Sequence, residues 1–305
     1  MDRLPLTIVH YGANDAETHR GGVESFARNL RLVFEHVELW HPAVLDVERV
    51  RRERMMVVCD NHWVLDWPDD IPVVGFQHGV AAVKRTHTHT WKDWRLARRQ
   101  ARAARRRNTV WVACAQWIAR TFGELHGNAA DVIVRHPVDL SRFDGRRDDV
   151  DPRLLLHDAR GEHKGERLIA ELVRRFPQWK LEPLACAPAE VPERMRLARG
   201  FLHLSRYEGN SIVCNEAMAM DLPCMFTRVG LMQDEDGPRD VRLVDPQLAF
   251  GDIDGLTAEL AAFLESLDAR AYHPRQWVLE HASIDLARAR WADAVALWRD
   301  RMADR

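Results

Sequence analysis

The chain has 305 residues, of which 46% are hydrophobic and 30% charged, and its formal net charge is −2. Such a length allows two domains that each bury their own core, and such a composition excludes a disordered polypeptide. No run of about 18 apolar residues marks a transmembrane segment, and the N-terminus reads as a strand rather than a secretion signal. We therefore expect a cytoplasmic protein. The five cysteines have no C-x-x-C spacing, which argues against a structural zinc site and a disulfide scaffold.

The N-terminal stretch predicts a strand at 6–10, a glycine-bearing loop and a helix at 23–32. Gly21 and Gly22 stand directly before this helix. Glycine lets a ligand approach the backbone closely, and the first N–H groups of a helix favour an anion. The pair therefore indicates contact with a diphosphate or an acceptor, although a tight turn would use the same residues.

Further strands are predicted at 37–40, 55–59, 73–76 and 110–115, and a helix at 116–126. Strands that alternate with helical patterns favour a parallel sheet. The strand at 73–76 runs into Gln77, His78 and Gly79, at the carboxyl end where open α/β sheets bind ligands. His78 is therefore a candidate ligand-binding residue, and the alternative is a histidine that only hydrogen-bonds within its loop.

The stretch 84–107 carries ten Lys and Arg residues against a single acid, Asp93. Its Trp and Ala residues recur at helical spacing, which predicts one helix with a narrow apolar stripe and a basic remainder. Such a surface is typical of proteins that bind a nucleic acid or an anionic membrane, and a merely solvated face is the alternative. The candidate acceptor surface consists of Lys84, Arg85, Lys92, Arg95, Arg98, Arg99 and Arg102.

The second half begins with a strand at 154–156 and a helix at 166–176. Arg160 and Lys164 lie in the glycine-containing turn between them. Cations in such a turn suit a nucleotide diphosphate, because they neutralise its charge both before and after a glycosidic bond breaks. A pair of exposed surface cations is the alternative.

A strand at 201–204, a polar turn, a helix at 212–220 and a strand at 224–227 form a predicted βαβ unit. Ser211 is the expected N-cap of the helix. Glu208 in the turn and Glu216 in the helix flank the helix start, where free backbone N–H groups favour a phosphate. This pattern predicts a phosphate at the helix tip with hydroxyl-bearing groups beside it; an ordinary βαβ unit with surface carboxylates is the alternative.

The run EGNSIVCNEAMAMDLPCMFTRVG resembles the E-x7-E signature of retaining, nucleotide-sugar-dependent glycosyltransferases of family four. The runs GGVE, QHG, VDLSRF and KG also resemble that family, in the same order. The resemblance implies an α/β GT-B fold, with two Rossmann-like domains that face each other across a cleft. The acceptor-binding domain is expected at 1–143, joined by the C-terminal helix at about 276–305, and the nucleotide-sugar-binding domain at 152–275.

The resemblance also implies roles for individual residues. Glu216 is expected to bind the ribose, and Glu208 and His78 to contact the donor sugar. Lys164 with Arg160 is expected to stabilise the leaving diphosphate, which makes Glu208, His78 and Lys164 the catalytic set. Retention of the anomeric configuration is implied, with no metal and no cofactor besides the nucleotide-sugar substrate, whose base and sugar stay open. The further residues expected to bind the donor or its diphosphate are Gly21, Gly22, Gly209, Asn210, Ser211 and Ile212.

The acceptor is left open between two anionic classes. One is a modified base in DNA, and the other is a glycan or lipid at a membrane, which would place the protein peripherally on that membrane. A base inside a duplex would have to be flipped out to be modified. A sugar-nucleotide-binding or epimerase-like protein of the same fold, without transferase activity, is a further alternative, because fold alone does not determine chemistry.

Overall fold

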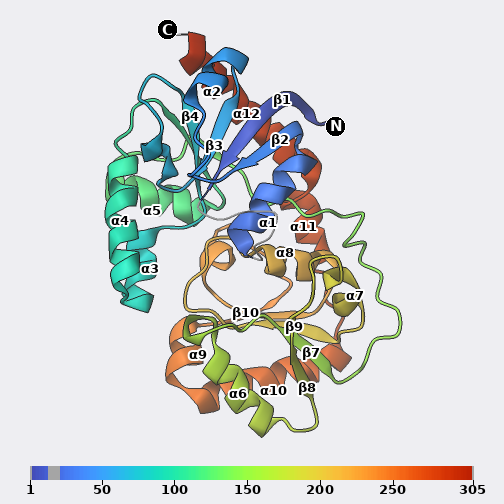
Figure 1. Cartoon of the computed structure of the whole chain (residues 1–305). Coiled ribbons are helices and arrows are strands. Elements are labelled where there is room, and N and C mark those ends of the chain that lie inside the picture. The colour runs from blue at the N-terminus through green and yellow to red at the C-terminus, as the bar shows by residue number, and fades with distance from the viewer. Residues whose placement is uncertain (1, 13–20, 304–305) are drawn as a thin grey trace. The chain divides into compact units, whose positions relative to one another are not determined.

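The fold is described from a computed structural model, for residues 2–12 and 21–303. The chain divides into two compact units, which are Met1–Pro137 with Ile284–Arg305, and Val138–Ser283. Figure 1 follows the chain through both units, from blue at the N-terminus to red at the C-terminus. Each unit consists of a parallel sheet with helices on its two faces, which is the architecture that alternating strands and helices predict.

The first unit contains, within its described residues, a six-stranded sheet in the order β2-β1-β3-β4-β5-β6, in which every pairing is parallel. The central strands read as continuous apolar runs, as expected for strands that are covered on both faces. The strands are β1 (Leu4–Tyr11), β2 (Phe34–Trp40), β3 (Met56–Asp60), β4 (Val73–Gln77), β5 (Thr109–Ala113) and β6 (Val132–Ile133).

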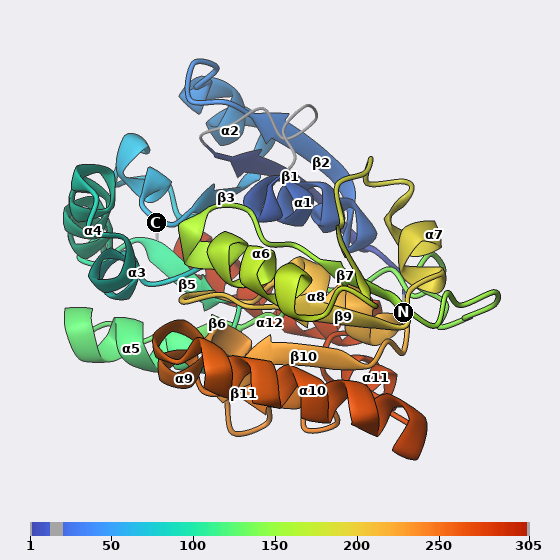
Figure 2. The same cartoon turned by 90° about the horizontal axis from the view of Figure 1, so that it is seen from below.

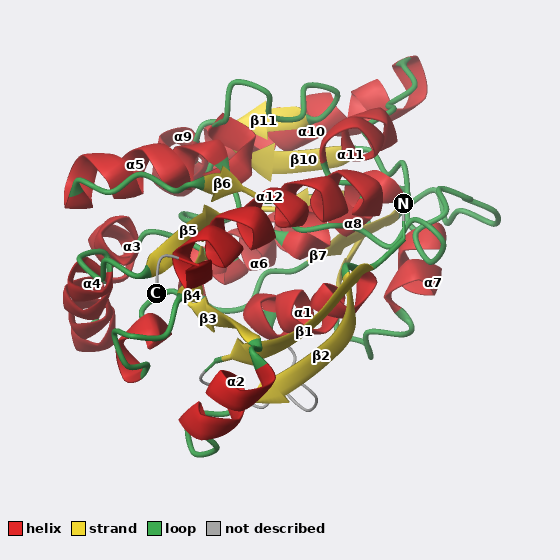
Figure 3. Ribbon diagram, turned by 90° about the horizontal axis from the view of Figure 1, so that it is seen from above, coloured by secondary structure: helices red, strands yellow, loops and turns green. Residues whose placement is uncertain are grey.

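Helices cover both faces of this sheet, as Figure 3 shows. On one face, Phe26 of α1 stacks on Phe76 at 4.0 Å between ring centroids, and Trp291 of α12 packs on Phe76 at 5.9 Å. On the other face, Trp111 packs on Phe122 of α5. The helices are α1 (Gly22–Asn29), η1 (Leu30–Leu32), α2 (Val47–Glu53), η2 (Trp63–Asp66), α3 (Ala81–Thr88), α4 (Trp91–Ala103), α5 (Gln116–His126) and α12 (Ile284–Ala303).

The basic stretch does not form the single helix that its spacing predicts. It divides into the end of α3 and all of α4, because His89 adopts a left-handed backbone with φ of 51°. Thr90 then caps α4: its hydroxyl accepts from the Asp93 N–H at 3.1 Å and donates to the Asp93 carboxylate at 2.5 Å. This reciprocal cap starts a new helix where the periodicity alone indicates continuity.

The second unit contains, in the part that is described, a five-stranded parallel sheet in the order β11-β10-β9-β7-β8. Its strands are β7 (Leu154–His157), β8 (Lys180–Pro183), β9 (Gly200–His203), β10 (Cys224–Thr227) and β11 (Arg242–Val244). Its helices are η3 (Glu162–Lys164), α6 (Glu166–Arg175), α7 (Val191–Arg196), α8 (Ile212–Ala219), η4 (Gly230–Gln233), α9 (Pro246–Gly251), α10 (Ile253–Ala269) and α11 (Arg275–His281).

Two helical layers enclose this second sheet. Figure 2 views the unit from the side of α6, α9 and α10, which lie in front of the strands. On that side Leu155, Leu202 and Met225 of the strands pack in one cluster with Leu172 and Phe263 of the helices. On the opposite side α8 is apolar around most of its circumference and mostly buried, so its N-terminus is held firmly at the edge of the sheet.

The unit boundaries differ from the expected domain limits at two places. The segment 138–143, expected in the first domain, belongs to the second unit. So does α11, expected with the C-terminal helix, because the backbone N–H of Arg275 donates to Asp221 at 3.1 Å and the Arg275 guanidinium donates to the carbonyl of Phe143 at 2.6 Å. The functional assignment of the two domains to acceptor and donor stays a prediction.

Candidate functional site

The loops after β7 and β9 leave the second sheet at its topological switch point. These two strands are neighbours, yet β8 lies beyond β7, so the chain crosses over between them. Loops that diverge at such a point leave a crevice at the carboxyl ends of the strands, where open α/β sheets bind ligands. Asp158 directly follows β7, and His203 is the last residue of β9.

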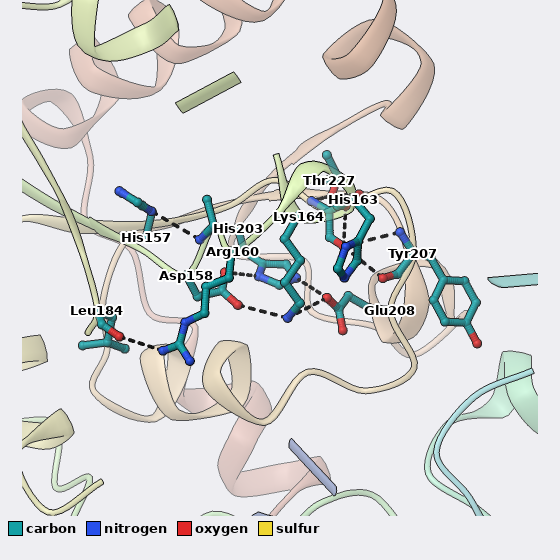
Figure 4. Close-up of polar contacts among 12 residues, drawn as sticks. His157, Asp158, Arg160, His163, Lys164, Leu184, His203, Tyr207, Glu208 and Thr227 are labelled. Carbon is teal, nitrogen blue, oxygen red and sulfur yellow. Dashed lines mark hydrogen bonds and ion pairs between the residues drawn. The ribbon is translucent and has the colours of Figure 1, made fainter. Parts of the chain in front are cut away.

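Four charged side chains from these two loops form a closed ring (Figure 4). The Lys164 ammonium lies 3.3 Å from Asp158 Oδ2 and 3.1 Å from Glu208 Oε1. The His203 ring contacts the same two carboxylates through its nitrogens: Nδ1 lies 2.5 Å from Asp158 Oδ1, and Nε2 lies 3.3 Å from Glu208 Oε1. Each cation therefore contacts both carboxylates, and a site built this way is held in place before any ligand arrives.

The ring shifts the pKa of each member. Burial alone would raise the pKa of Glu208, but Lys164 and His203 lower it to about 2. The pKa of Asp158 is also lowered, because His203 and Lys164 outweigh the cost of its burial. Burial opposes the charge on Lys164, whereas Glu208 and Asp158 raise its pKa above the usual range. Both carboxylates and the ammonium are therefore ionised at neutral pH.

Backbone bonds join the two loops that carry the ring. The carbonyl of His163 accepts from the N–H of Arg206 at 2.8 Å and from the hydroxyl of Ser205 at 3.3 Å. Gly165, next to Lys164, has φ of +73°, and a Cβ there would collide with the Leu204 carbonyl. Only glycine fits this left-handed position against the neighbouring backbone, so the KG pair of the sequence is a requirement of the loop's packing.

The start of α8 presents backbone N–H groups near Glu208. Ser211 occupies the N-cap position of α8, but its hydroxyl makes no capping hydrogen bond to the helix. Asn210 accepts at Oδ1 from Asn215 Nδ2 at 2.9 Å, and the carbonyl of Gly209 accepts from the Leu231 N–H at 2.9 Å. These bonds fix the turn before Ile212, and the first N–H groups of a helix favour an anion. The proposed phosphate contacts of this turn stay a prediction.

Arg160 points away from the charged ring. Its side chain is exposed, and Nη2 donates to the carbonyl of Leu184 at 3.0 Å (Figure 4). The guanidinium of Arg160 therefore lies at the end of β8 rather than beside Lys164 and Glu208. A role at a diphosphate would require this guanidinium to leave Leu184, so among the two cations of the turn Lys164 is the one already in position.

Glu216 differs from Glu208 in its surroundings. It is partly buried on α8, and no hydrogen bond or ion pair of its carboxylate to another described residue is found. Burial raises the pKa of Glu216 to about 7, and Arg142 counteracts this only in part. A buried carboxylate without a partner is costly in the free protein, and hydroxyl groups of a ligand would satisfy it.

Glu216→Gln should stabilise the protein at alkaline pH. Because the pKa of Glu216 is raised from 4.5 to about 7, the folded state loses stability as the pH rises through this range. We expect the variant to unfold with a free energy about 1–3 kcal/mol higher than wild type at pH 8, and with a much smaller gain at pH 5. Urea unfolding at both pH values measures this, and an equal gain at the two would contradict it.

The first unit brings three polar residues together at the carboxyl edge of its own sheet. Asp60 ends β3 and is buried, and its Oδ1 lies 2.9 Å from His10 Nε2 and 2.8 Å from His78 Nε2. Burial alone would raise the pKa of Asp60, but the two imidazoles hold it well below its usual range. The ring of His78 also stacks on that of His136, at 5.7 Å between centroids. The predicted His78 is thus part of a buried cluster.

The geometry of Asp60 determines how His78 meets a ligand. An ionised carboxylate only accepts hydrogen bonds, so the Nε2 of His78 carries the proton. In the tautomer that donates from Nε2, Nδ1 is an acceptor, and no partner for it is found among the described residues. The side chain is 11% exposed, so the described residues do not enclose it completely.

Gly21 and Gly22 have different surroundings. Gly21 is the N-cap of α1 in an extended conformation, and a Cβ on it would collide with the Glu24 carboxylate. Gly22 has open space where its Cβ would be. The first glycine therefore makes room for Glu24, and the second is not required by packing among the described residues. The remainder of this loop, 13–20, lies outside the described residues, and the predicted diphosphate contact stays a prediction.

The basic surface is smaller than its residue count indicates. Lys84 pairs with the buried Asp93 at 3.1 Å, and Arg99 lies over the Trp63 ring and 3.6 Å from Asp66. These two cations are thus directed toward their own unit. The remaining predicted residues are exposed, and one of them, Arg98, lies over the Trp94 ring at 4.8 Å. They are Arg85, Lys92, Arg95, Arg98 and Arg102.

The sequence interpretation did not identify His203, Asp158, Asp60 or His10 as site residues. They share a signal that the pattern does contain: each lies in, or directly after, the last residues of a parallel strand that is otherwise apolar. A polar side chain at that place lies on the ligand-binding edge of the sheet. The signal predicts position, whereas the pairing of these residues with Lys164 or His78 depends on which strands are neighbours.

Several solved structures are similar to this chain over nearly its whole length. HepE of Anabaena in complex with UDP aligns over 95% of this chain and 100% of its own, with a TM-score of 0.68 and 12% identity. Sucrose-phosphate synthase of Thermosynechococcus elongatus aligns over 98% and 100%, with a TM-score of 0.70 and 14% identity. A glycosyltransferase of Rickettsia africae aligns over 98% and 99%, with a TM-score of 0.64 and 12% identity.

The chain has the GT-B fold. The similarity spans both units of the chain and nearly the whole length of each of these proteins. The sequence matches no protein-family model, and no curated protein matches it either. At identities of 12–14% the similarity establishes the fold, and the chemistry has to be argued from the site itself.

Neither a membrane-spanning helix nor a metal-ligating cluster is found in the described residues. None of the helices there is both long and apolar enough to cross a bilayer. Nor do three or more His, Cys, Asp or Glu side chains in that part of the chain form a group that could hold a metal ion. Independence of a metal stays a prediction.

Proposed function

We propose that the chain is a glycosyltransferase that takes a sugar from a nucleotide-diphosphate donor and transfers it with retention of configuration. The observation that carries the proposal is the ring of Lys164, Glu208, Asp158 and His203 near the N-terminus of α8, in a GT-B fold. An ammonium group and helix N–H groups together form a site for a diphosphate. HepE, which has the same fold, has been crystallised with UDP and with UDP-glucose, which supports such a ligand.

In this mechanism the second unit binds and activates the donor. Lys164 and the N–H groups from Asn210 to Ile212 stabilise the charge that grows on the diphosphate as the glycosidic bond breaks. Glu208 accepts from hydroxyl groups of the transferred sugar, which its low pKa permits because it stays ionised. Glu216 accepts from the ribose, which satisfies a carboxylate that is otherwise without a partner.

A panel of nucleotide sugars tests this function. The protein would be incubated with donors that carry different bases and sugars, and mass spectrometry would detect the free nucleoside diphosphate and any sugar-bearing product. We expect one donor class to be consumed. Binding of a nucleotide sugar without turnover would favour a binding protein of the same fold, and an altered sugar still attached to its nucleotide would favour an epimerase. Neither binding nor turnover with any donor would contradict the proposal.

The acceptor is proposed to be anionic, because α3 and α4 carry five exposed cations for which no ion pair with another described residue is found. Duplex DNA and anionic liposomes, each in a salt series, separate the two acceptor classes. Electrostatic binding to DNA weakens steeply as salt increases, because each phosphate contact releases a counterion. Binding to neither would leave a neutral soluble acceptor.

Charge reversal on α4 should weaken binding to the anionic surface. We expect Arg95→Glu with Arg102→Glu to reduce retention by about tenfold at low salt and to flatten its salt dependence, because about two phosphate contacts are lost. Arg174→Glu on α6 serves as a matched control, because it is an exposed helix arginine in the other unit. Retention that falls equally in the control and the α4 variant would contradict the assignment of this surface.

A further inference from the structure

His203, like Asp158, is a member of the charged ring to which neither the sequence pattern nor the proposed chemistry gives a role. It ends β9 and is 2% exposed, so water does not satisfy its ring nitrogens. Nδ1 lies 2.5 Å from a carboxylate oxygen of Asp158, and Nε2 lies 3.3 Å from a carboxylate oxygen of Glu208. Both neighbours are ionised carboxylates, so each ring nitrogen faces a group that can accept a hydrogen bond but cannot donate one.

A carboxylate beside each ring nitrogen favours a proton on both, which makes the ring an imidazolium; Nδ1 hydrogen-bonds to Asp158, whereas Nε2 lies 3.3 Å from Glu208 Oε1 without hydrogen-bond geometry. The groups that face it come from four elements: Asp158 after β7, Lys164 of η3, Glu208 of the turn and Cys214 of α8. Burial raises the pKa of the Cys214 thiol, so it is neutral and adds no charge. Burial also opposes a charge on His203, but the Asp158 carboxylate raises its pKa well above the usual range.

The ring therefore contains two cations and two anions in balance. If His203 were neutral, Lys164 would be the single cation for two partly buried carboxylates. Withdrawing it toward a ligand would leave both of them uncompensated, which is strongly unfavourable away from water. With an imidazolium in place, Asp158 and Glu208 keep a counterion of their own, and the ammonium can turn toward an incoming anion.

We propose that His203 is a positioning residue which, as an imidazolium, holds Asp158 and Glu208 and so releases Lys164 to bind the phosphates of the ligand. The proposal rests on the proposed function, because it takes a diphosphate to be the ligand of Lys164. Its consequence is a site whose affinity for phosphate depends on the charge of a residue that does not touch phosphate. Affinity should fall at alkaline pH as His203 loses its proton.

Calorimetric titration of the full chain with UDP and with inorganic pyrophosphate, from pH 6 to 10, tests the proposal. Pyrophosphate carries the two phosphates without depending on the unknown base. We expect His203→Gln to bind both probes about tenfold more weakly than wild type at pH 7 and to lose the alkaline decrease, because Lys164 stays with the carboxylates. His203→Lys, which keeps a cation, should restore part of the affinity.

His157→Gln is the matched control, because this buried imidazole on β7 accepts from the backbone N–H of Ala159 rather than contacting a carboxylate (Figure 4). It should bind the probes as wild type does. A second readout is independent of ligand: ¹⁵N NMR of the histidine side chains should show His203 doubly protonated at pH 8. A merely structural role would change the folding of His203→Gln without changing how binding depends on pH.

The outcomes are separable from those of the donor panel. A neutral His203 ring at pH 7, or unchanged pyrophosphate affinity in a folded His203→Gln variant, would overturn the role of His203 even if the protein transfers sugar. Wild-type protein that binds neither probe would also overturn it. Turnover of a nucleotide sugar, measured separately, decides whether the proposed function itself stands.

Discussion

Lys164→Ala is expected to lower turnover by about 10²–10³-fold, which is the scale of losing one group that stabilises the developing charge of a transition state. The side chain of Lys164 is 27% exposed, so this cation of the ring can meet a ligand. The side chain of His203, by contrast, is enclosed. The effect should appear in kcat as well as in KM, since charge on the leaving diphosphate grows as the bond breaks. Steady-state kinetics with the donor from the panel measures it.

Lys180→Ala provides the control for this prediction. Lys180 lies at the start of β8 and pairs with Asp151 at 2.6 Å on the surface, so its loss removes a lysine from the same unit without touching the ring. Its turnover should match wild type. A Lys164→Ala protein that melts as wild type does and keeps near wild-type turnover would remove Lys164 from the active site. Lys164→Gln, which keeps a polar side chain, serves if the alanine variant is unstable.

We propose that His78 contacts the ligand, and on that proposal Asp60→Asn is expected to lower turnover by about 10–100-fold, the scale seen when a group that orients a metal-bound histidine is removed. Asp60 contacts no ligand in this scheme. It fixes the protonated nitrogen of His78, and without its charge that ring is free to carry the proton on Nδ1 instead. The side chain would then donate where the ligand's hydroxyl group needs an acceptor, so KM should rise together with the fall in kcat.

Histidine ¹⁵N NMR separates positioning from simple destabilisation in this variant. In the wild type Nε2 of His78 should carry a proton, because it faces Asp60. In Asp60→Asn the proton should be distributed between the two ring nitrogens. Asp66→Asn is the matched control, because Asp66 accepts from the Tyr11 hydroxyl at 3.1 Å and contacts neither His10 nor His78. An unchanged His78 tautomer in Asp60→Asn would show that Asp60 does not position this ring.

The elements with strong local signals could be read from the sequence. The helix at 116–126 and the strand at 224–227 agree with α5 and β10 because apolar periodicity, a stop signal and short length coincide there. The break between α3 and α4 was missed, because a capping exchange between Thr90 and Asp93 overrides a periodicity that continues through it. Local polar bonds of this kind leave little trace in hydrophobic spacing.

The GT-B architecture was implied by the resemblance of the sequence motifs to those of a glycosyltransferase family, and the structure has this fold. The order of strands and charged turns along the chain predicts Lys164 and Glu208 after strands of the second sheet and Glu216 on the helix that follows. Which charges meet depends on the tertiary structure. His203 lies near Lys164 because β9 pairs with β7, although the two strands are far apart in the sequence. Asp60 reaches His78 because β3 pairs with β4. Electrostatic coupling depends on distances of a few ångströms, which the fold sets and the order of residues along the chain does not.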